Sequence, residues 1–292
     1  MIGSKLAPAC RVCESRAVRP LCVKGPATYY LCRGCDTVFQ YPLPSAEEMI
    51  RYADTQYREG VYRDYVRARA MKHAHFRARL GEFATRFPPP GRLLDLGCSC
   101  GYFLDVALES GYDAYGVEFS EEAIAAAQPA TRQRIRRANV NDAGGDHPHE
   151  YDVVTAFDII EHVEDPIAFL VEIAGMLVPG GGVVLSTPDT GHVLRYVMGT
   201  RWPMLQPMQH TTLMSRLGLR IALERAGFQQ VVVTTARKTL TLEYLVEQLR
   251  DHNPALHAAY TMTRRIVPGA VRTYPLRINI GEQMAVAVKP SW

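Results

Sequence analysis

The sequence predicts an α/β fold: an open, mostly parallel sheet with helices on both faces, preceded by a small cysteine-rich module. A short apolar strand over Arg92–Leu96 runs into a glycine-bounded turn and then into an amphipathic helix, as in a buried parallel sheet. Strand and helix patterns continue to alternate downstream of it. Two Cys-x-x-Cys pairs lie near the N-terminus, outside this alternation.

Composition and charge exclude several classes of protein. The 292 residues are 47% apolar and 22% charged, so a packed core is expected. The net charge of +3 is too small to indicate nucleic-acid binding by itself. We expect no membrane span and no signal peptide, and therefore a reducing, cytoplasmic location. In that compartment the seven cysteines are metal ligands or bystanders more often than disulfides.

Three regions are expected along the chain. Residues 1–44 form the cysteine-rich module, which ends at two prolines. Residues 45–90 form a helical linker with helices on the substrate side. Residues 91–292 form the α/β domain, with a roof loop at about 189–215 and a lid at about 238–275.

The spacing of the paired cysteines predicts a zinc site. Cys10 and Cys13 are followed, after eighteen residues, by Cys32 and Cys35. Each pair places two thiolates on one turn, and a tetrahedral zinc ion joins the turns. Cys22 falls outside this pattern and reads as a bystander. A shell of four thiolates leaves no open position, so the zinc is expected to be structural rather than catalytic.

The region from Ser45 to Phe87 is predicted to be helical. Ser45 and Glu48 have the spacing of a capping box, and apolar residues recur at helical intervals after them. The opposite face is basic, and it either meets an anionic substrate or RNA, or is simply solvated. Its arginines are Arg63, Arg67, Arg77 and Arg79.

The glycine turn indicates which cofactor binds. A dinucleotide fingerprint requires glycine at 99 and 102, where this chain has Ser99 and Tyr102. The spacing Asp95-x-Gly97-x-x-x-Gly101 instead resembles motif I of the class I S-adenosylmethionine (SAM) methyltransferases. The resemblance implies that Asp95 faces the ammonium group of SAM. It also implies that Gly97 lets the backbone pass close to the methionine part of SAM.

The strand that follows supplies the next expected contact. Tyr115–Phe119 reads as a second strand, and Glu118 at its end can accept both ribose hydroxyls. The resemblance implies that Phe119 lies against the adenine and that Asn139 or Asp142, after a third strand, reads the adenine amino group. The full set of cofactor-binding residues that it implies is Asp95, Gly97, Cys98, Gly101, Glu118, Phe119, Asn139, Val140 and Phe157.

A fourth strand, Tyr151–Phe157, leads into a segment that carries the first candidate base. The block Glu161-His-Val-Glu-Asp-Pro166 resembles the Glu-His-Val-x-Asp-Pro segment of methyltransferases like those of ubiquinone biosynthesis. It follows the carboxyl end of the strand, where a substrate should arrive. His162 is therefore a candidate base, although a helix-capping or packing role fits the sequence equally well.

The second candidate base is His210, in the roof loop after a fifth strand over Val183–Thr187. We favour it over His162 because its loop shows no evident structural need for an imidazole; the alternative is an exposed loop histidine. Ser215 then caps a helix that Gly227 ends. The remaining expected elements are a strand over Val231–Thr235, a helix over Leu240–Leu249 and a closing antiparallel strand over Ile278–Val288.

Taken in order, these motifs resemble class I SAM methyltransferases that carry a zinc ribbon and are related to the ubiquinone-type O-methyltransferases. The resemblance implies a Rossmann-like sheet of seven strands, SAM as cofactor and structural Zn²⁺. It also implies methyl transfer to a hydroxyl oxygen of a small molecule such as a saccharide, a polyketide or another secondary metabolite. The sequence leaves the oligomeric state open.

Three alternatives stay open on the sequence alone. The first is C- or N-methylation of a sugar or natural product. Sugar C-methyltransferases with the same ribbon also resemble the chain, but they carry a further C-terminal domain. The roughly sixty residues after Phe228 are expected to leave no room for such a domain. The second is a zinc-ribbon protein that binds or modifies RNA, which the low net charge disfavours. The third is an inactive scaffold, which the intact Asp95, Gly97 and Glu118 disfavour.

Overall fold

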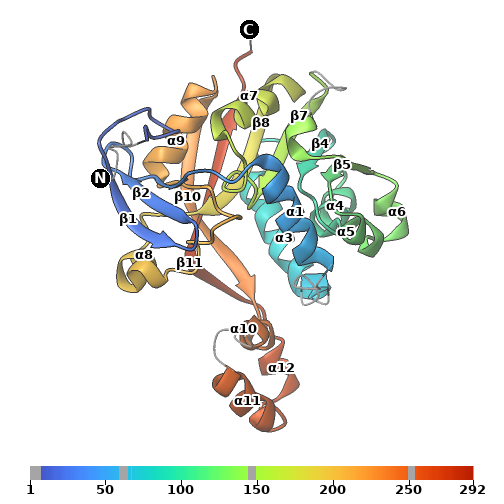
Figure 1. The fold of residues 1–292 in the computed structure, drawn as a ribbon. Coiled ribbons are helices and arrows are strands. Elements are labelled where there is room, and N and C mark those ends of the chain that lie inside the picture. The colour runs from blue at the N-terminus through green and yellow to red at the C-terminus, as the bar shows by residue number, and fades with distance from the viewer. Residues whose placement is uncertain (1–7, 59–64, 67, 144–148, 249–253, 292) are drawn as a thin grey trace.

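A seven-stranded sheet forms the centre of the molecule, and helices cover both of its faces (Figure 1). The computed structural model describes residues 8–58, 65–66, 68–143, 149–248 and 254–291. The strand order is β10-β11-β8-β7-β4-β5-β6, and β11 pairs antiparallel with both of its neighbours while the other pairings are parallel. This confirms the predicted Rossmann-like sheet with its closing antiparallel strand. The strands are β4 (Arg92–Leu96), β5 (Asp113–Glu118), β6 (Ile135–Arg137), β7 (Tyr151–Phe157), β8 (Leu177–Pro188), β10 (Gln229–Leu240) and β11 (Leu276–Val288).

The helices bury the two faces of this sheet in separate clusters. Side chains of β8 alternate between them: Val184 packs with α3 and α4, and Leu185 packs with α7 and α9. No helix in the described part of the chain is long and apolar enough to cross a membrane. The helices are α1 (Ala46–Arg58), α3 (Arg69–Phe83), α4 (Tyr102–Glu109), α5 (Glu121–Ala126), α6 (Pro129–Arg132), α7 (Pro166–Met176), α8 (Val193–Met198), α9 (Arg216–Arg225), α10 (Leu242–Gln248), α11 (Pro254–Thr263) and α12 (Gly269–Arg272), with 3-10 turns η1 (Val140–Asp142) and η2 (Gly199–Arg201).

The helix starts lie where the sequence places them. Ser45 Oγ accepts from Glu48 N, and the Ser45 backbone N–H donates to the Glu48 carboxylate at 2.7 Å, which completes the capping box at α1. Asp165 and Ser215 cap α7 and α9 by accepting backbone N–H groups of the first turn. The sequence predicted one helical region over 45–87; the structure has α1 and α3, and Arg63 and Arg67 lie outside the described residues.

Two strands are longer than expected. β8 begins at Leu177, directly after α7, so Gly180, Gly181 and Gly182 belong to the strand, which was expected to begin at Val183. β10 extends to Leu240, and α10 begins only at Leu242. In Figure 1, α10, α11 and α12 lie beyond the far ends of β10 and β11, away from the main sheet.

The cysteine-rich module does not stand apart from the α/β domain. Its strands β1 (Val18–Lys24), β2 (Ala27–Cys32) and β3 (Val38–Tyr41) form a second sheet, which β9 (Thr212–Leu213) of the roof loop completes in the order β1-β2-β3-β9. Ser215 Oγ donates to the Cys35 carbonyl at 2.7 Å, which ties the module to the start of α9.

Trp202 of the roof loop belongs to the core of the second sheet. It is buried against Tyr29 and Leu213 in the core of the second sheet, so it does not roof the substrate pocket. An indole packed against the face of a sheet buries more apolar area than one over an open pocket. The roof loop therefore connects the two sheets.

Candidate functional site

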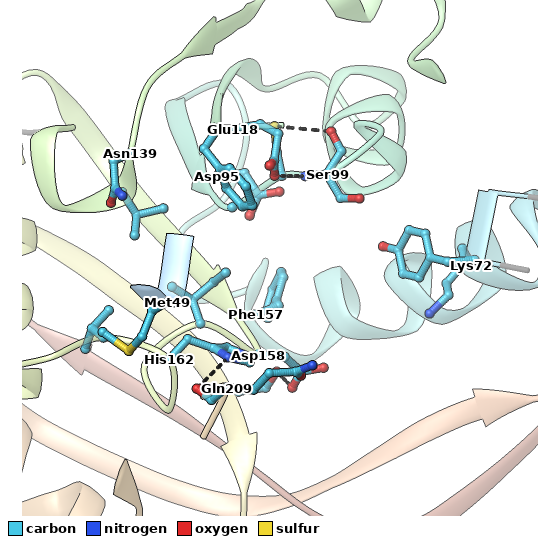
Figure 2. A pocket seen from close by; sticks show the side chains of 18 of the residues that line it. Met49, Lys72, Asp95, Ser99, Glu118, Asn139, Phe157, Asp158, His162 and Gln209 are labelled. Atoms are coloured by element: carbon cyan, nitrogen blue, oxygen red, sulfur yellow. Dashed lines mark hydrogen bonds between the residues drawn. The ribbon is translucent and has the colours of Figure 1, made fainter. Parts of the chain in front are cut away.

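A cavity of about 410 Å³ opens at the carboxyl ends of β4, β5 and β7. The chain order reverses here, because β4 has β5 on one side and β7 on the other. In open α/β sheets such a switch point is the usual ligand site. Figure 2 shows Glu118, Asp95 and Ser99 at one end of the cavity, with His162, Asp158 and Gln209 at the other.

The predicted cofactor residues converge on this cavity. The residues among them that line it are Asp95, Gly97, Cys98, Glu118, Phe119, Asn139, Val140 and Phe157. Gly101 does not line it; it begins α4 at a φ of 72°, where a Cβ would approach Thr131 Cγ2 to 2.7 Å. Gly97 has a φ of 70°, and a Cβ there would lie 2.2 Å from Ile159 Cδ1. The two glycines therefore shape the turn that borders the cavity.

Glu118 is the acid at the end of β5. Its Oε2 accepts the Ser99 backbone N–H at 2.9 Å, and its Oε1 accepts the Ser120 backbone N–H at 2.9 Å. Each oxygen keeps a further lone pair for a ligand hydroxyl. Burial raises the pKa of Glu118, which is 2% exposed, while the backbone N–H groups oppose that rise.

Asp95 is held by a hydrogen bond from a neighbouring strand, and Asn139 by one within its own turn. Thr155 Oγ1 donates to Asp95 Oδ1 at 2.6 Å, and burial raises the pKa of Asp95 to about 7. A ligand ammonium beside this carboxylate would favour its charged form. Asn139 Oδ1 accepts the Asn141 backbone N–H at 3.0 Å. Asp142, the other residue considered for adenine, does not line the cavity.

The two candidate bases lie side by side, but only one borders the cavity. Their ring centroids are 4.9 Å apart, and His162 lines the cavity while His210 does not. His210 Nδ1 donates to the Met204 carbonyl at 2.7 Å, which gives this imidazole the structural role that the sequence did not reveal. Burial and the neighbouring His162 lower the pKa of His210 to about 3. The position of His210 therefore gives no support to our preference for it.

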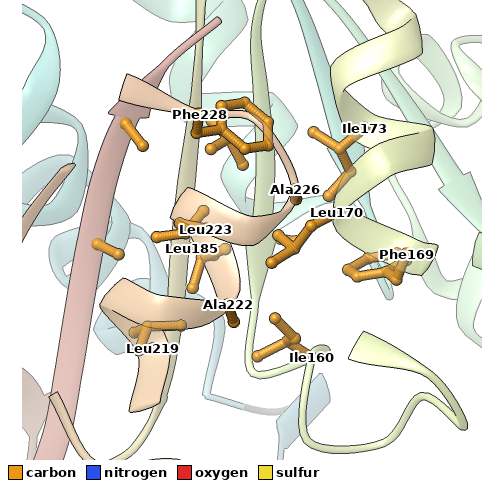
Figure 3. Packing of buried hydrophobic residues seen from close by; sticks show 14 of the residues in the cluster. Ile160, Phe169, Leu170, Ile173, Leu185, Leu219, Ala222, Leu223, Ala226 and Phe228 are labelled. Carbon is orange, nitrogen blue, oxygen red and sulfur yellow. The ribbon is translucent and has the colours of Figure 1, made fainter. Parts of the chain in front are cut away.

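The loop that carries His162 is held in place by a buried side chain close to it in the sequence. Ile160 is fully buried among the side chains of α7 and α9, as Figure 3 shows. His162 Nδ1 lies 3.1 Å from the Gln209 carbonyl and must carry the proton there, since a carbonyl only accepts. The Nε2 of a neutral ring is then left as the acceptor. With Glu161 and His210, His162 also forms a group whose metal-ligating atoms lie within 4.8 Å of one another.

Several cavity residues escaped the sequence analysis. Most of them come from α1, from α3 and from the end of β10, while Tyr65 precedes α3 and Asp158 follows β7. They surround the part of the cavity away from Glu118. The helical spacing in α3 could have placed Lys72, His75 and Phe76 on one face, but no local signal links them to β10. The missed lining residues include Met49, Tyr52, Tyr65, Lys72, His75, Phe76, Asp158, Lys238, Thr239 and Leu240.

A network of paired charges, of which Arg79 and Glu282 are buried, lies beside this part of the cavity. Lys238 Nζ is 2.8 Å from Asp158 Oδ2 and 3.4 Å from Glu282 Oε1, and Arg79 Nη2 is 2.7 Å from Glu282 Oε2. Burial opposes the charge on Asp158, but Lys238, Glu282 and Arg79 together lower the pKa of Asp158. Arg79 is only 1% exposed, so the basic face predicted for α3 is partly an internal ion pair.

The four cysteines of the ribbon form a compact cluster. The Sγ atoms of Cys10 and Cys35 are 3.6 Å apart, those of Cys13 and Cys32 are 3.5 Å apart, and all four lie within 4.8 Å of one another. A tetrahedral ion at about 2.3 Å from each sulfur requires about 3.8 Å between sulfurs, so the group fits zinc. Cys22 lies outside this group.

Known proteins resemble the chain in both sequence and fold. A family model described as a methyltransferase domain matches residues 62–233. A relative from Nitrosospira multiformis named ubiquinone biosynthesis O-methyltransferase is 32% identical over 100 residues, 32% of this chain and 42% of that protein. One of the same name from Xanthomonas campestris pv. campestris is 31% identical over 121 residues, 39% of this chain and 51% of that protein. The chain thus spans about half the length of these curated relatives.

A solved structure supports the fold. A SAM-dependent methyltransferase from Archaeoglobus fulgidus matches with a TM-score of 0.52 and 18% sequence identity, over 74% of this chain and 94% of that one. At that identity the similarity shows the fold alone.

Proposed function

The chain belongs to the methyltransferase domain family, and from that premise we propose that it is an enzyme that moves the methyl group of SAM to a hydroxyl oxygen of a small molecule. The observation that carries the proposal is that the predicted SAM residues and a separate polar region line one and the same cavity. The two relatives named as O-methyltransferases support oxygen as the methyl acceptor.

The residues of the chain would act mainly by positioning. Asp95 would hold the ammonium group of SAM, Glu118 the ribose hydroxyls, and Asn139 the adenine, while Phe119 packs against the adenine ring. SAM, when bound, supplies an already activated methyl group on sulfur. Holding two reactants in line is worth several orders of magnitude in rate, so a strong nucleophile on the protein is not required.

Among the described residues, His162 is the one best placed to take the hydroxyl proton. It lines the cavity, its Nδ1 is fixed by the Gln209 carbonyl, and its Nε2 is left to accept. Burial lowers its pKa, so the imidazole is neutral at pH 7. A neutral, oriented imidazole is what a general base requires.

We also propose that zinc in the four-cysteine cluster is structural. All four positions of a tetrahedral shell are taken by thiolates, and the cluster borders β9 and α9 rather than the cavity. Thiolates that stay available for zinc require a reducing compartment such as the cytoplasm.

Glu118→Ala is expected to weaken SAM binding about ten- to a hundredfold, because hydrogen bonds to a charged group are worth roughly 1.5–3 kcal/mol. Titration calorimetry measures the affinity. Glu121→Ala serves as the control, since Glu121 is an exposed acid that pairs with Arg137 on the surface. Because Glu118 also accepts two backbone N–H groups, thermal unfolding is followed in parallel. Equal SAM affinities for Glu118→Ala and the wild type would remove Glu118 from the site.

The reaction itself is tested with labelled SAM and fractionated extract of the source organism. Mass spectrometry of the labelled product identifies the acceptor, and its NMR spectrum shows whether the new methyl group is on oxygen, carbon or nitrogen. Label transferred only to carbon or nitrogen would leave the enzyme class intact and replace O-methylation. Label recovered in RNA would favour the RNA-modification alternative; against it, Arg79 is buried and Arg77 is paired with Glu109.

A further inference from the structure

One cation in the cavity has no carboxylate partner among the described residues. Lys72 of α3 lines the cavity, and within the described residues its ammonium meets only aromatic faces, at 3.9 Å from the Tyr65 ring centroid and 5.5 Å from that of Tyr244. Burial and the charge of Lys238 lower the pKa of Lys72 to about 8. Lys238, in contrast, is paired with two carboxylates. Figure 2 shows Lys72 to one side of Phe157.

His75 is a hydrogen-bond donor on the same face of α3. It lies three residues after Lys72 and also lines the cavity. Its Nδ1 accepts the Thr239 backbone N–H at 3.2 Å, so in the neutral ring the proton is on Nε2. Burial, Arg79 and Lys72 lower the pKa of His75 to about 3, which keeps the ring neutral. Its free edge therefore offers an N–H and no charge.

Thr239 adds a second neutral donor. Thr239 is 4% exposed and lines the cavity. Its Oγ1 is buried and has no hydrogen-bond partner in the described part of the chain. Most buried hydroxyls in native structures are hydrogen-bonded, so an unpartnered one beside a cavity points to a ligand atom.

The fixed charges around these groups leave an excess of positive charge. The cations are Lys72, Lys238 and Arg79, and the nearby acids are Asp158, Glu161 and Glu282. Burial raises the pKa of Glu161 to about 8, so this acid is largely protonated at neutral pH, whereas Glu282 is paired with Arg79 and Lys238. One unpaired cation and two neutral donors match a single negative charge.

We infer that Lys72, His75 and Thr239 bind a carboxylate group of the methyl acceptor, so that the substrate is a hydroxylated carboxylic acid. The inference rests on the proposed function, because it concerns the acceptor end of the same cavity. A carboxylate accepts from an ammonium, an imidazole N–H and a hydroxyl with its two oxygens.

The test compares the affinities of two small ligands, benzoate and benzamide, for the complex of the protein with S-adenosylhomocysteine. Benzoate carries the carboxylate, and benzamide has nearly the same shape without the charge. Benzoate is expected to bind about tenfold more tightly than benzamide, as one charge-assisted contact provides. Lys72→Met and Thr239→Val should each abolish that preference. Thr234→Val is the matched control, since Thr234 is exposed on the same strand, and it should keep the preference.

Three results would overturn the inference. The first is equal affinity of the wild type for benzoate and benzamide. Undetectable binding of both ligands counts as this result. The second is a preference for benzoate that survives in Thr239→Val and Lys72→Met. The third is a Lys72→Met variant that loses affinity for S-adenosylhomocysteine while Thr239→Val changes nothing, because the anion would then be the carboxylate of the cofactor. Failure to bind S-adenosylhomocysteine at all would instead reject the proposed function.

Discussion

Replacing His162 with alanine is expected to lower methyl transfer to the wild-type acceptor by roughly 10²–10⁴-fold, while SAM affinity stays nearly unchanged. The physical reason is the loss of the neutral imidazole that lines the cavity and that the Gln209 carbonyl orients through Nδ1. The rate of product formation from labelled SAM, with the acceptor identified as above, measures the effect.

The pH profile gives a second readout for the same residue. Burial lowers the pKa of His162 below its ordinary value of about 6.5, so the imidazole stays neutral, and the rate stays high, down to that lower pKa. The rate should then fall only on the acid side of the usual histidine range. His162→Ala should lose this acid limb together with the activity.

His210→Ala is the matched comparison. It removes the neighbouring imidazole and its hydrogen bond to the Met204 carbonyl, so we expect a loss of thermal stability and a smaller loss of turnover than in His162→Ala. The opposite ranking would make His210 the base after all. Wild-type turnover in both variants would mean that catalysis is positioning alone.

Replacing Cys32 with serine is expected to reduce bound zinc from one ion per chain to none and to unfold the ribbon. Structural zinc sites contribute on the order of 10–16 kcal/mol of binding energy, more than a small module can replace. Elemental analysis of protein purified without added metal, together with thermal unfolding, measures both effects. Cys22→Ser is the control and should keep its zinc, because Cys22 lies outside the cluster. Zinc unchanged in Cys32→Ser would reject the site.

The structure adds a consequence for activity. β3 of the ribbon pairs with β9 of the roof loop, and Met208 and Gln209, shortly before β9, line the cavity. Loss of zinc should therefore also lower turnover, although no cysteine of the cluster borders the cavity. Full activity in a zinc-free protein would show that the roof loop holds its position without the ribbon.

Local spacing determined much of this protein. The turn after β4 needs glycine within a few residues of the strand, and both Gly97 and Gly101 have positive φ as such a turn requires. The caps at Ser45, Asp165 and Ser215 depend on atoms two or three residues away, so the sequence shows them directly. The cysteine pairs are equally local within each turn.

Only the tertiary structure decided which distant segments meet. Arg79 looks like a surface charge on a helical face, but β11 brings Glu282 against it. His210 looks like a free loop histidine, but the loop folds its own Met204 carbonyl onto the ring. Lys72 and Thr239 are far apart in the sequence and line the same cavity because β10 lies against α3. The reason is physical: spacing along the chain defines contacts within one turn or strand, whereas burial and charge pairing depend on the path of the whole backbone.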